Sequence, residues 1–357
     1  MSAPEPSPPV KEGVIGQQVA FARVREWFAR DRFPHSLLIE GPGGVGKRAM
    51  ALQIAAIANC ETSDGCGTCR SCRLIAAGEH PDVIALEPDP AKASARISVD
   101  QVREVIRRAG YHRYLGRHRV VIIDPADAMG VEAANALLKT LEEPLEGTHF
   151  ILLTSRPQAL LPTIRSRVQR LRLGAVDPLV MSAWLDTRGH GPVAERAARL
   201  AEGRPGLALS LAEGGLERRD QLLSELHRAL GADLKEMTDW TSSQISGSRA
   251  QWTGRVEEIL ELLEDLVRDA TLVGAGAALP LRMPEVSHLS EAWAEVLWPG
   301  GVTRCAQAIA ECRQAMAANA NGRLLLDTLL ARLATELGRA RRAPLHPDSP
   351  ALARDLP

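Results

Sequence analysis

The sequence of 357 residues is poor in aromatic side chains and has no excess of charge of either sign. Phe, Trp and Tyr make up 3% of the chain, so its cores must be built mainly from aliphatic residues. The 43 Lys and Arg residues against 44 Asp and Glu residues give a formal net charge of -1. This balance excludes a protein that coats nucleic acid through a global positive charge, although it leaves room for a local basic patch.

The sequence also lacks a run of about 18 apolar residues and a secretory signal, because residues 1–13 are rich in Pro, Ser and Glu. We therefore expect a cytoplasmic protein with no membrane partner. The six cysteines of such a chain are expected to be thiols or metal ligands rather than disulfides. The length predicts two or three domains, preceded by a disordered leader over residues 1–12.

A glycine-rich segment lies between the apolar run Ser36–Glu40 and a helical stretch. Its characteristic residues are Gly41, Gly43, Gly44, Gly46 and Lys47. Strand, glycine loop and helix in this order are typical of a phosphate-binding loop. In such a loop backbone N–H groups surround an anion and the lysine reaches the β- and γ-phosphates. We expect these residues to form the phosphate end of a nucleotide site.

Two positions of this nucleotide site depart from the pattern of an ATPase. Arg48 stands where the motif has a Ser or Thr hydroxyl for Mg²⁺. Asp124 follows the strand Val120–Ile123 in the position of the acid that holds Mg²⁺, but Pro125 replaces the usual second acid. The site is therefore predicted to be impaired, with ATP binding that is weak or absent.

Apolar segments recur along the first half of the chain with helical stretches between them. One helix is expected from Gln18 to Arg32, with Pro34 ending it, and another is expected to open in the segment Ile97–Arg103 and to run to about Tyr111. The expected strands are 36–40, 83–86, 119–124, 149–154 and 168–173. This alternation predicts an α/β fold in which a parallel sheet is covered by helices on both faces.

Four cysteines lie close together between the first two strands. They are Cys60, Cys66, Cys69 and Cys72, with the spacing C-x5-C-x2-C-x2-C. Four thiolates can close tetrahedrally around Zn²⁺ and leave no open position, so a structural zinc site is favoured. A redox pair at Cys69 and Cys72 and an iron-sulfur cluster are the alternatives. Cys305 and Cys312 share a helical face and are expected to be buried thiols.

The most basic tract of the chain runs from residue 103 to residue 119. It contains Arg103, Arg107, Arg108, Arg113, Arg117, His118 and Arg119. Such a tract forms either a solvated helix face or a contact with a nucleic-acid backbone. The sequence leaves both interpretations open.

Together these motifs resemble the bacterial clamp-loader branch of the AAA+ family, and the resemblance covers nearly the whole chain. It rests on Gly16-Gln17, the loop 41–47, the four cysteines, the run 133–144, Thr154-Ser155 and the segment 163–167. It implies an AAA+ parallel-sheet (RecA-like) domain over 13–173, with a zinc-binding insertion at 60–72. A small helical lid over 174–214, an all-α collar and oligomerisation domain over 215–338 and a disordered tail over 339–357 would follow.

Within that family the altered residues resemble the subunits that do not hydrolyse ATP. The resemblance implies a structural stator of the clamp loader that is not an enzyme as an isolated chain. That clamp loader serves a replicative DNA polymerase holoenzyme, whose activity is that of a DNA-directed DNA polymerase, a nucleotidyltransferase. Its partners would be delta-type and tau/gamma-type subunits in a hetero-pentameric ring, and through them a sliding clamp and primer-template DNA. An active ATPase motor subunit and an unrelated nucleotide-binding switch are the alternatives.

The resemblance also assigns roles to single residues near the nucleotide. Arg167 lies in Ser166-Arg167-Val168, where the family usually has Ser-Arg-Cys, and corresponds to an arginine finger that reaches the ATP of a neighbouring subunit. Arg165 is the alternative residue for this role. Gly206 falls where active members carry an arginine that senses the γ-phosphate, with Arg204 two residues away.

Overall fold

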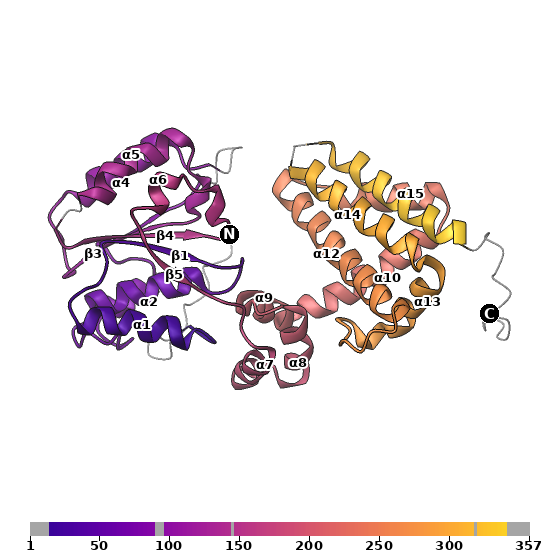
Figure 1. Cartoon of the computed structure of the whole chain (residues 1–357), viewed down its shortest axis with the longest axis horizontal. Coiled ribbons are helices and arrows are strands. Elements are labelled where there is room, and N and C mark those ends of the chain that lie inside the picture. Colours follow the sequence, from indigo (N-terminus) through magenta and orange to yellow (C-terminus); the bar gives the residue numbers. More distant parts are fainter. Residues whose placement is uncertain (1–13, 90–95, 144–145, 318–319, 341–357) are drawn as a thin grey trace. The chain divides into compact units, whose positions relative to one another are not determined.

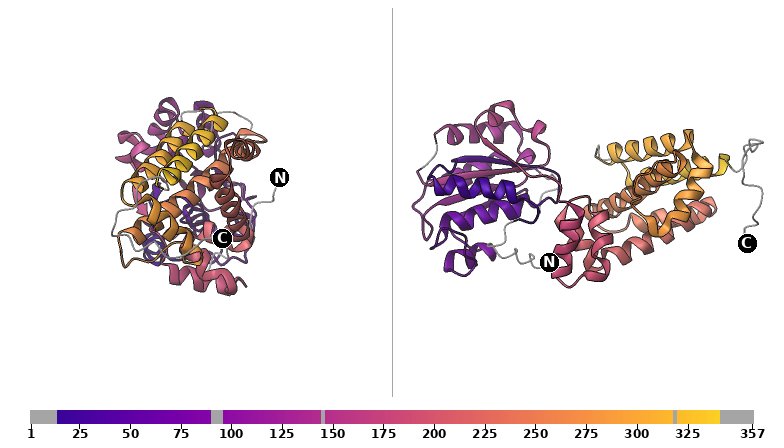
Figure 2. Two further views of the ribbon diagram at one scale, coloured as in Figure 1. Left: turned by 90° about the vertical axis from the view of Figure 1, so that its right-hand side faces the viewer. Right: turned by 60° about the horizontal axis from the view of Figure 1, so that its bottom comes forward.

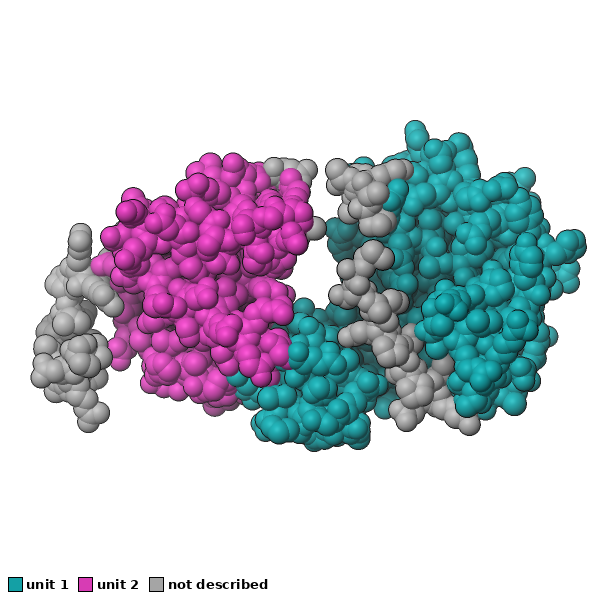
Figure 3. All heavy atoms as spheres, turned by 180° about the vertical axis from the view of Figure 1, so that it is seen from behind, with its two compact units in different colours: residues 1–213 teal, residues 214–357 magenta. Residues whose placement is uncertain are grey.

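The computed structural model describes residues 14–89, 96–143, 146–317 and 320–340. The chain divides into two compact units, residues 1–213 and 214–357 (Figure 3). The first unit contains the predicted core segment 13–173 and nearly all of the predicted lid segment 174–214. The division of these residues into a core domain and a lid domain stays a prediction. The predicted leader 1–12 and residues 341–357 of the predicted tail lie outside the described residues.

Five parallel strands form the sheet of the first unit, in the order β2-β3-β4-β1-β5. They are β1 (Ser36–Glu40), β2 (Val83–Leu86), β3 (Arg119–Ile123), β4 (Thr148–Thr154) and β5 (Gln169–Arg172). Every strand expected from the sequence is present, with ends that differ by at most one residue from those expected. β1 lies between β4 and β5, with Leu38 opposite Leu152 on one side and Arg170 on the other. The predicted α/β fold with a parallel sheet is confirmed.

Helices cover both faces of this sheet (Figure 1, Figure 2). The helices and short helical turns of the unit are α1 (Gln18–Ala29), α2 (Lys47–Asn59), α3 (Arg70–Ala76), α4 (Val99–Ala109), η2 (Ala126–Ala128), α5 (Val131–Glu142), η3 (Pro157–Ala159), α6 (Pro162–Arg165), α7 (Pro178–Thr187), α8 (Gly191–Leu200) and α9 (Pro205–Ser210). Side chains alternate across a strand, so Leu37 and Ile39 pack with α1 and α2 whereas Leu38 packs with α4 and α5.

Helix α1 ends at Ala29, and the expectation that it continues to Arg32 and is stopped by Pro34 was wrong. Asp31 adopts a left-handed conformation with φ 51°, and the Arg32 N–H donates to the Trp27 carbonyl at 2.8 Å. These contacts satisfy carbonyls of the last turn, so the helix ends before the proline is reached. Helix α4 likewise ends two residues before Tyr111.

The second unit is helical throughout its described residues. The division between the two units falls within the π-helical turn η4 (Leu211–Gly215). The elements of the second unit are α10 (Leu216–Gly231), α11 (Leu234–Gln244), α12 (Arg249–Gly274), η5 (Pro284–Val286), α13 (Ser287–Leu297), α14 (Gly300–Ala317) and α15 (Gly322–Ala340). Cys305 and Cys312 are buried in α14, as expected. Among the helices of the described ranges, none combines the length and apolar character needed to cross a bilayer.

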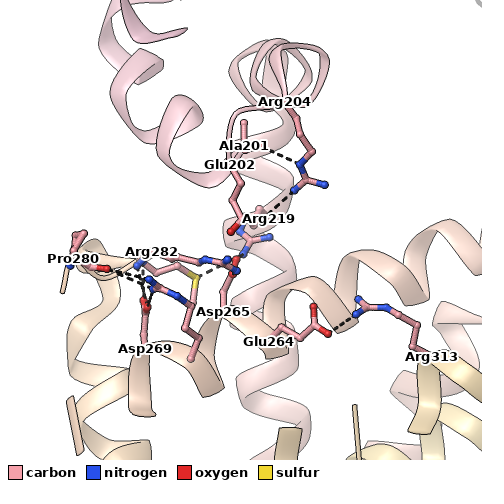
Figure 4. A network of polar contacts seen from close by, with 12 residues as sticks. Ala201, Glu202, Arg204, Arg219, Glu264, Asp265, Asp269, Pro280, Arg282 and Arg313 are labelled. Carbon is pink, nitrogen blue, oxygen red and sulfur yellow. Dashed lines mark hydrogen bonds and ion pairs between the residues drawn. The ribbon is translucent and has the colours of Figure 1, made fainter. Parts of the chain in front are cut away.

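Two buried aspartates of α12 hold the loop that precedes α13 (Figure 4). Asp269 accepts hydrogen bonds from the backbone N–H groups of Arg282 at 2.9 Å and Met283 at 2.8 Å. Asp265 pairs with the guanidinium groups of Arg219 and Arg282. Burial raises the pKa of Asp265 to about 6, against the opposing effect of Arg219. The cluster therefore fixes an irregular segment of this unit through long-range polar contacts.

Candidate nucleotide site and cysteine cluster

A cavity of about 770 Å³ opens in the first unit beside the glycine loop. Its walls come from the loop, from the segment before α1, from the end of β3 and from helices α7 and α9. The predicted residues that line it are Gly43, Gly44, Gly46, Lys47 and Asp124. Gly41, the remaining predicted loop residue, directly follows β1 and accepts a hydrogen bond from Lys47 through its carbonyl. A cavity of this volume suits a ligand of nucleotide size.

The loop conformation depends on glycine at the start of α2. Gly46 caps this helix with φ 98° and Gly44 has φ 75°, both in the left-handed region. A Cβ atom on Gly46 would lie 2.6 Å from Cγ1 of Val14. The loop can therefore turn its backbone around an anion only because side chains are absent at these positions.

Lys47 occupies the loop in the structure. Its ammonium donates to the carbonyls of Gly41 at 2.9 Å and Pro42 at 2.7 Å and to Oγ of Ser155 at 2.9 Å. Burial lowers the pKa of Lys47, and Asp124 and Asp127 act in the opposite direction. The ammonium stands at the mouth of the loop, where phosphate oxygens could replace these acceptors.

Arg48 pairs with the acid that would hold the metal in an ATPase. Its Nη1 atom lies 3.5 Å from Oδ2 of Asp124 and also donates to the carboxylate of Glu87. Burial raises the pKa of Asp124, while the guanidinium acts in the opposite direction. Mg²⁺ requires oxygen ligands in an octahedral arrangement. A guanidinium at position 48 and a proline at position 125 offer none, so these residues do not fit the magnesium ion of an ATPase site.

Positions 204 and 206, at the start of α9, both lie beside the loop, and a Cβ atom on Gly44 would lie 3.2 Å from Cβ of Arg204. The backbone nitrogen of Gly206 is 3.5 Å from the carbonyl oxygen of Gly44. The Arg204 guanidinium contacts the carbonyl of Ala201 at 3.0 Å and the carboxylate of Glu202 at 3.9 Å (Figure 4). Gly206, at the position predicted for the γ-phosphate sensor, offers no charged group to a phosphate.

Two residues of the cavity wall were not foreseen from the sequence. Trp184 of α7 and Arg188, directly after this helix, line the cavity, and Cζ of Arg188 is 4.5 Å from the centroid of the Trp184 ring. Their spacing of four residues on a short helix was the available signal, because it places both side chains on one face. They give the cavity an aromatic surface and a further cation.

Arg167 lies at the opposite end of the sheet from the glycine loop. The loop follows the carboxyl end of β1, whereas Arg167 precedes the amino end of the parallel edge strand β5. The length of β5 separates the two ends by about 13 Å. The Arg167 side chain, 35% exposed, pairs with Glu142 of α5 and donates to the Thr163 carbonyl at 3.0 Å. It is therefore not placed to serve the loop of its own chain.

The four cysteines meet in one cluster, and the structure brings together all the predicted metal ligands. Their Sγ atoms lie within 4.8 Å of one another, and those of Cys60 and Cys69 are 4.0 Å apart. Four thiolates around Zn²⁺ require separations of about 3.8 Å. Backbone N–H groups of Cys66 and Cys69 donate to Sγ of Cys60 and Cys66, each at 3.2 Å. The donor set and the geometry fit a bound metal ion.

The cysteine stretch contains a helix that the sequence did not reveal. Cys69 caps α3, and Cys72 lies in its first turn, so the last ligand projects from a helix rather than from a turn. Arg117 holds the stretch from outside: its guanidinium donates to the carbonyls of Cys60 and Glu61 and to Oγ of Ser63 at 3.1 Å. The cluster is thus tied to the segment that leads into β3.

The basic tract fits neither of the two interpretations as a whole. Arg117 binds the cysteine stretch, and Arg119 is buried and bonded to carbonyls around the end of α4. Only part of the tract is a solvated face, where Arg103 and Arg107 pair with Asp100 and Glu104 on the same helix. Much of its charge therefore serves local structure.

Comparisons with known proteins match the chain to subunits of DNA polymerase III, among them delta' and tau/gamma subunits. A sequence profile described as DNA polymerase III, delta subunit, matches residues 16–177. The DNA polymerase III subunit delta' of Escherichia coli is 33% identical over 254 residues, which cover 70% of this chain and 74% of that protein. Its counterpart in Yersinia pestis is 33% identical over 293 residues, covering 78% of this chain and 82% of that protein.

A shorter and more similar match is the subunit delta' of Pseudomonas aeruginosa, 46% identical over 141 residues. This match covers 39% of the chain and 42% of that protein. Among solved structures, a DNA polymerase III gamma subunit-related protein from Thermotoga maritima has a TM-score of 0.50 at 18% identity. It covers 90% of this chain and 99% of that chain, and the likeness concerns the fold alone.

Proposed function

Because the chain belongs to the delta-prime family of DNA polymerase III subunits, we propose that it is the stator of a clamp loader. In this role it does not hydrolyse ATP itself and supplies Arg167 to a neighbouring ATPase subunit. Its partners are delta-type and tau/gamma-type subunits in a hetero-pentameric ring, which together load a sliding clamp onto primed DNA. The chain thereby supports the DNA-directed DNA polymerase without performing nucleotidyl transfer.

One observation carries the proposal: the chain has an altered site at one end of its sheet and an arginine at the other. Arg48 pairs with Asp124, Pro125 replaces the second acid, and Gly206 faces the loop. Metal placement and water activation both depend on the groups that are missing. Arg167, beyond the reach of its own loop, is useful for nucleotide chemistry only if another subunit brings a nucleotide to it.

We assign Zn²⁺ to the cysteine cluster as a structural ion. Four sulfur ligands leave no open coordination position for chemistry, and the apolar content of the stretch is small. Metal binding would therefore supply folding free energy to residues that cannot order themselves by burial.

The decisive experiment measures ATP hydrolysis by the assembled complex in the presence of clamp and primed DNA. Arg167→Ala should leave assembly intact and lower the stimulated ATPase about 10-fold or more, because a finger in trans is worth ~10³ or more at the site it serves. Arg165→Ala is the matched control, since Arg165 is two residues away and bonded to Gln158 at 2.6 Å. A normal rate with Arg167→Ala would reject this assignment, and a loss with Arg165→Ala alone would move the finger to Arg165.

The alternative is an active motor subunit, which is tested on the isolated chain. The proposal expects no ATP turnover by the purified protein in Mg²⁺. Robust hydrolysis that disappears in Lys47→Ala would establish the motor and exclude the stator.

A further inference from the structure

The strongest feature that the stator role leaves unused is the intact cavity beside the glycine loop. We propose that this cavity binds a nucleotide without a divalent cation, with Arg48 as the resident cation at the phosphate end. This inference is independent of Arg167, so either proposal can fail while the other stands.

The first support is the place of Arg48. Arg48 is the second residue of α2 and directly follows Lys47. Its side chain therefore projects from the N-terminal turn of α2, next to the glycine loop. Glu87, just after β2, and Asp124, at the end of β3, hold the guanidinium from two neighbouring strands. The positive charge of Arg48 balances the negative charge of Asp124, so no magnesium ion is needed there for charge balance.

The second support is that Arg48 does not fill the cavity. The volume of about 770 Å³ remains with the side chain in place, and Arg48 forms part of the wall. Its side chain is 52% exposed. A guanidinium has N–H donors on several edges, so it can contact carboxylates on one edge and a phosphate oxygen on another.

The remaining walls suit the other parts of a nucleotide. Gly43, Gly44 and Gly46 line the phosphate end together with Lys47. Ile15, Trp184 and Leu209 give apolar and aromatic surface for a base, a common complement to a few placed polar groups. Gly206 offers no side chain for a γ-phosphate, which favours a nucleoside diphosphate over a triphosphate.

The experiment is calorimetric titration of ADP into the full chain, with Mg²⁺ and with excess EDTA. The dissociation constants under the two conditions should agree within about 3-fold, a difference of about 0.7 kcal/mol or less. Lys47→Ala should weaken binding about 10-fold or more under both conditions, which locates the nucleotide at the loop. Arg103→Thr, an exposed arginine of α4 outside the cavity, is the matched control and should bind ADP normally.

Arg48→Thr tests the arginine itself, because it removes the guanidinium and restores the hydroxyl of the motif. ADP binding in EDTA should fall about 10-fold or more, and Mg²⁺ should recover part of the loss. Arg48→Lys keeps a cation and should remain independent of Mg²⁺, and unchanged melting temperatures of both variants would show intact folding. The proposal is overturned if the unaltered chain needs Mg²⁺, if it binds no ADP under either condition, or if Arg48→Thr binds more tightly in EDTA.

Discussion

The guanidinium of Arg119 donates a hydrogen bond of 2.8 Å to the carboxylate of Asp82, and the two side chains are 2% and 0% exposed. Arg119 also donates to backbone carbonyls around the end of α4, and Asp82 accepts N–H groups from the loop that follows. The partners are Arg108, Ala109, Tyr111 and His112 for the arginine, and Tyr114, Leu115 and Gly116 for the aspartate. One buried pair therefore shapes the whole segment between α4 and β3.

Arg119→Ala should destabilise the first unit by about 3 to 5 kcal/mol, because it leaves Asp82 buried without its charged partner. The free energy of unfolding, measured with urea, provides the test. The exposed Arg103→Ala, on the same basic tract, should change it by no more than about 0.5 kcal/mol. Equal effects of the two substitutions would show that the buried pair is not the structural centre of this segment.

The parts of the molecule that the sequence predicted are those specified by residues close together in the chain. The glycine loop, the four cysteines and the apolar strands belong to this class. Gln17 does not: it binds the backbone of Gly174, 157 positions away, through bonds of 2.7 and 3.2 Å. The partners of Arg119 and Arg117 are also distant, 37 and 57 positions away at Asp82 and Cys60. The sequence of a basic tract does not show which of its side chains pair with residues far away in the chain.

The same reasoning applies to the candidate nucleotide site. The sequence identified Arg48, Pro125 and Gly206 as departures at separate positions. It could not show that Arg48 contacts Asp124, since Arg48 lies in α2 and Asp124 follows β3, two elements far apart in the chain. Nor could it place the side chains of α7 in the cavity, because this requires the packing of the helices that follow the sheet.

His149 should make the first unit sensitive to mild acid. Its ring packs against Phe33 and His118, and Nδ1 lies 3.1 Å from the Pro34 carbonyl oxygen. Since a carbonyl only accepts, Nδ1 carries the proton and Nε2 accepts from Nδ1 of His118 at 3.0 Å. Burial lowers the pKa of His149 from 6.5 to about 4, with further lowering by His118 and His35.

The unfolded chain therefore binds a proton at higher pH than the folded one. Stability from the neutral His149 is fully present above about pH 6.5 and is lost as the pH falls toward 4, by roughly 3 kcal/mol at most. His149→Gln should flatten the dependence of the free energy of unfolding on pH in this window. His227→Gln, on the exposed side of α10, is the control and should keep the original slope. An unchanged slope in His149→Gln would refute the assignment.

The cysteine cluster should contain one Zn²⁺ per chain, detectable by elemental analysis of protein purified without chelators. Cys66→Ser should lower the zinc content and increase hydrogen exchange over residues 60–76, because the metal supplies order there. Cys305→Ser, which changes a buried thiol of α14, should leave the zinc content unchanged. Zinc-free protein with a fully protected stretch would argue against a structural metal.

Arg117→Ala should loosen the same stretch without removing a ligand. The Arg117 guanidinium donates hydrogen bonds to the carbonyls of Cys60 and Glu61. The substitution removes these bonds, so the backbone of Cys60, the first metal ligand, is held less tightly. We expect zinc to remain bound but to dissociate faster in a competing chelator. Arg113→Ala is the matched control, because Arg113 bonds to the Glu146 carbonyl at 2.9 Å, away from the cysteines.

The pair between Arg167 and Glu142 allows a finger to be distinguished from a structural arginine. If Arg167 only anchors the end of α5, Glu142→Gln removes the charged partner and should lower the ATPase of the assembled complex as much as Arg167→Ala does. If Arg167 reaches a nucleotide in a neighbouring subunit, Glu142→Gln leaves its guanidinium in place and the ATPase should stay near normal. Arg167→Lys keeps the charge but loses the planar fork, so it should restore only part of the activity that alanine removes. Stability measurements on the three isolated variants should differ by no more than about 1 kcal/mol, because the pair is partly exposed. A complex that is impaired equally by Glu142→Gln and Arg167→Ala would identify the pair as structural and leave the finger without support.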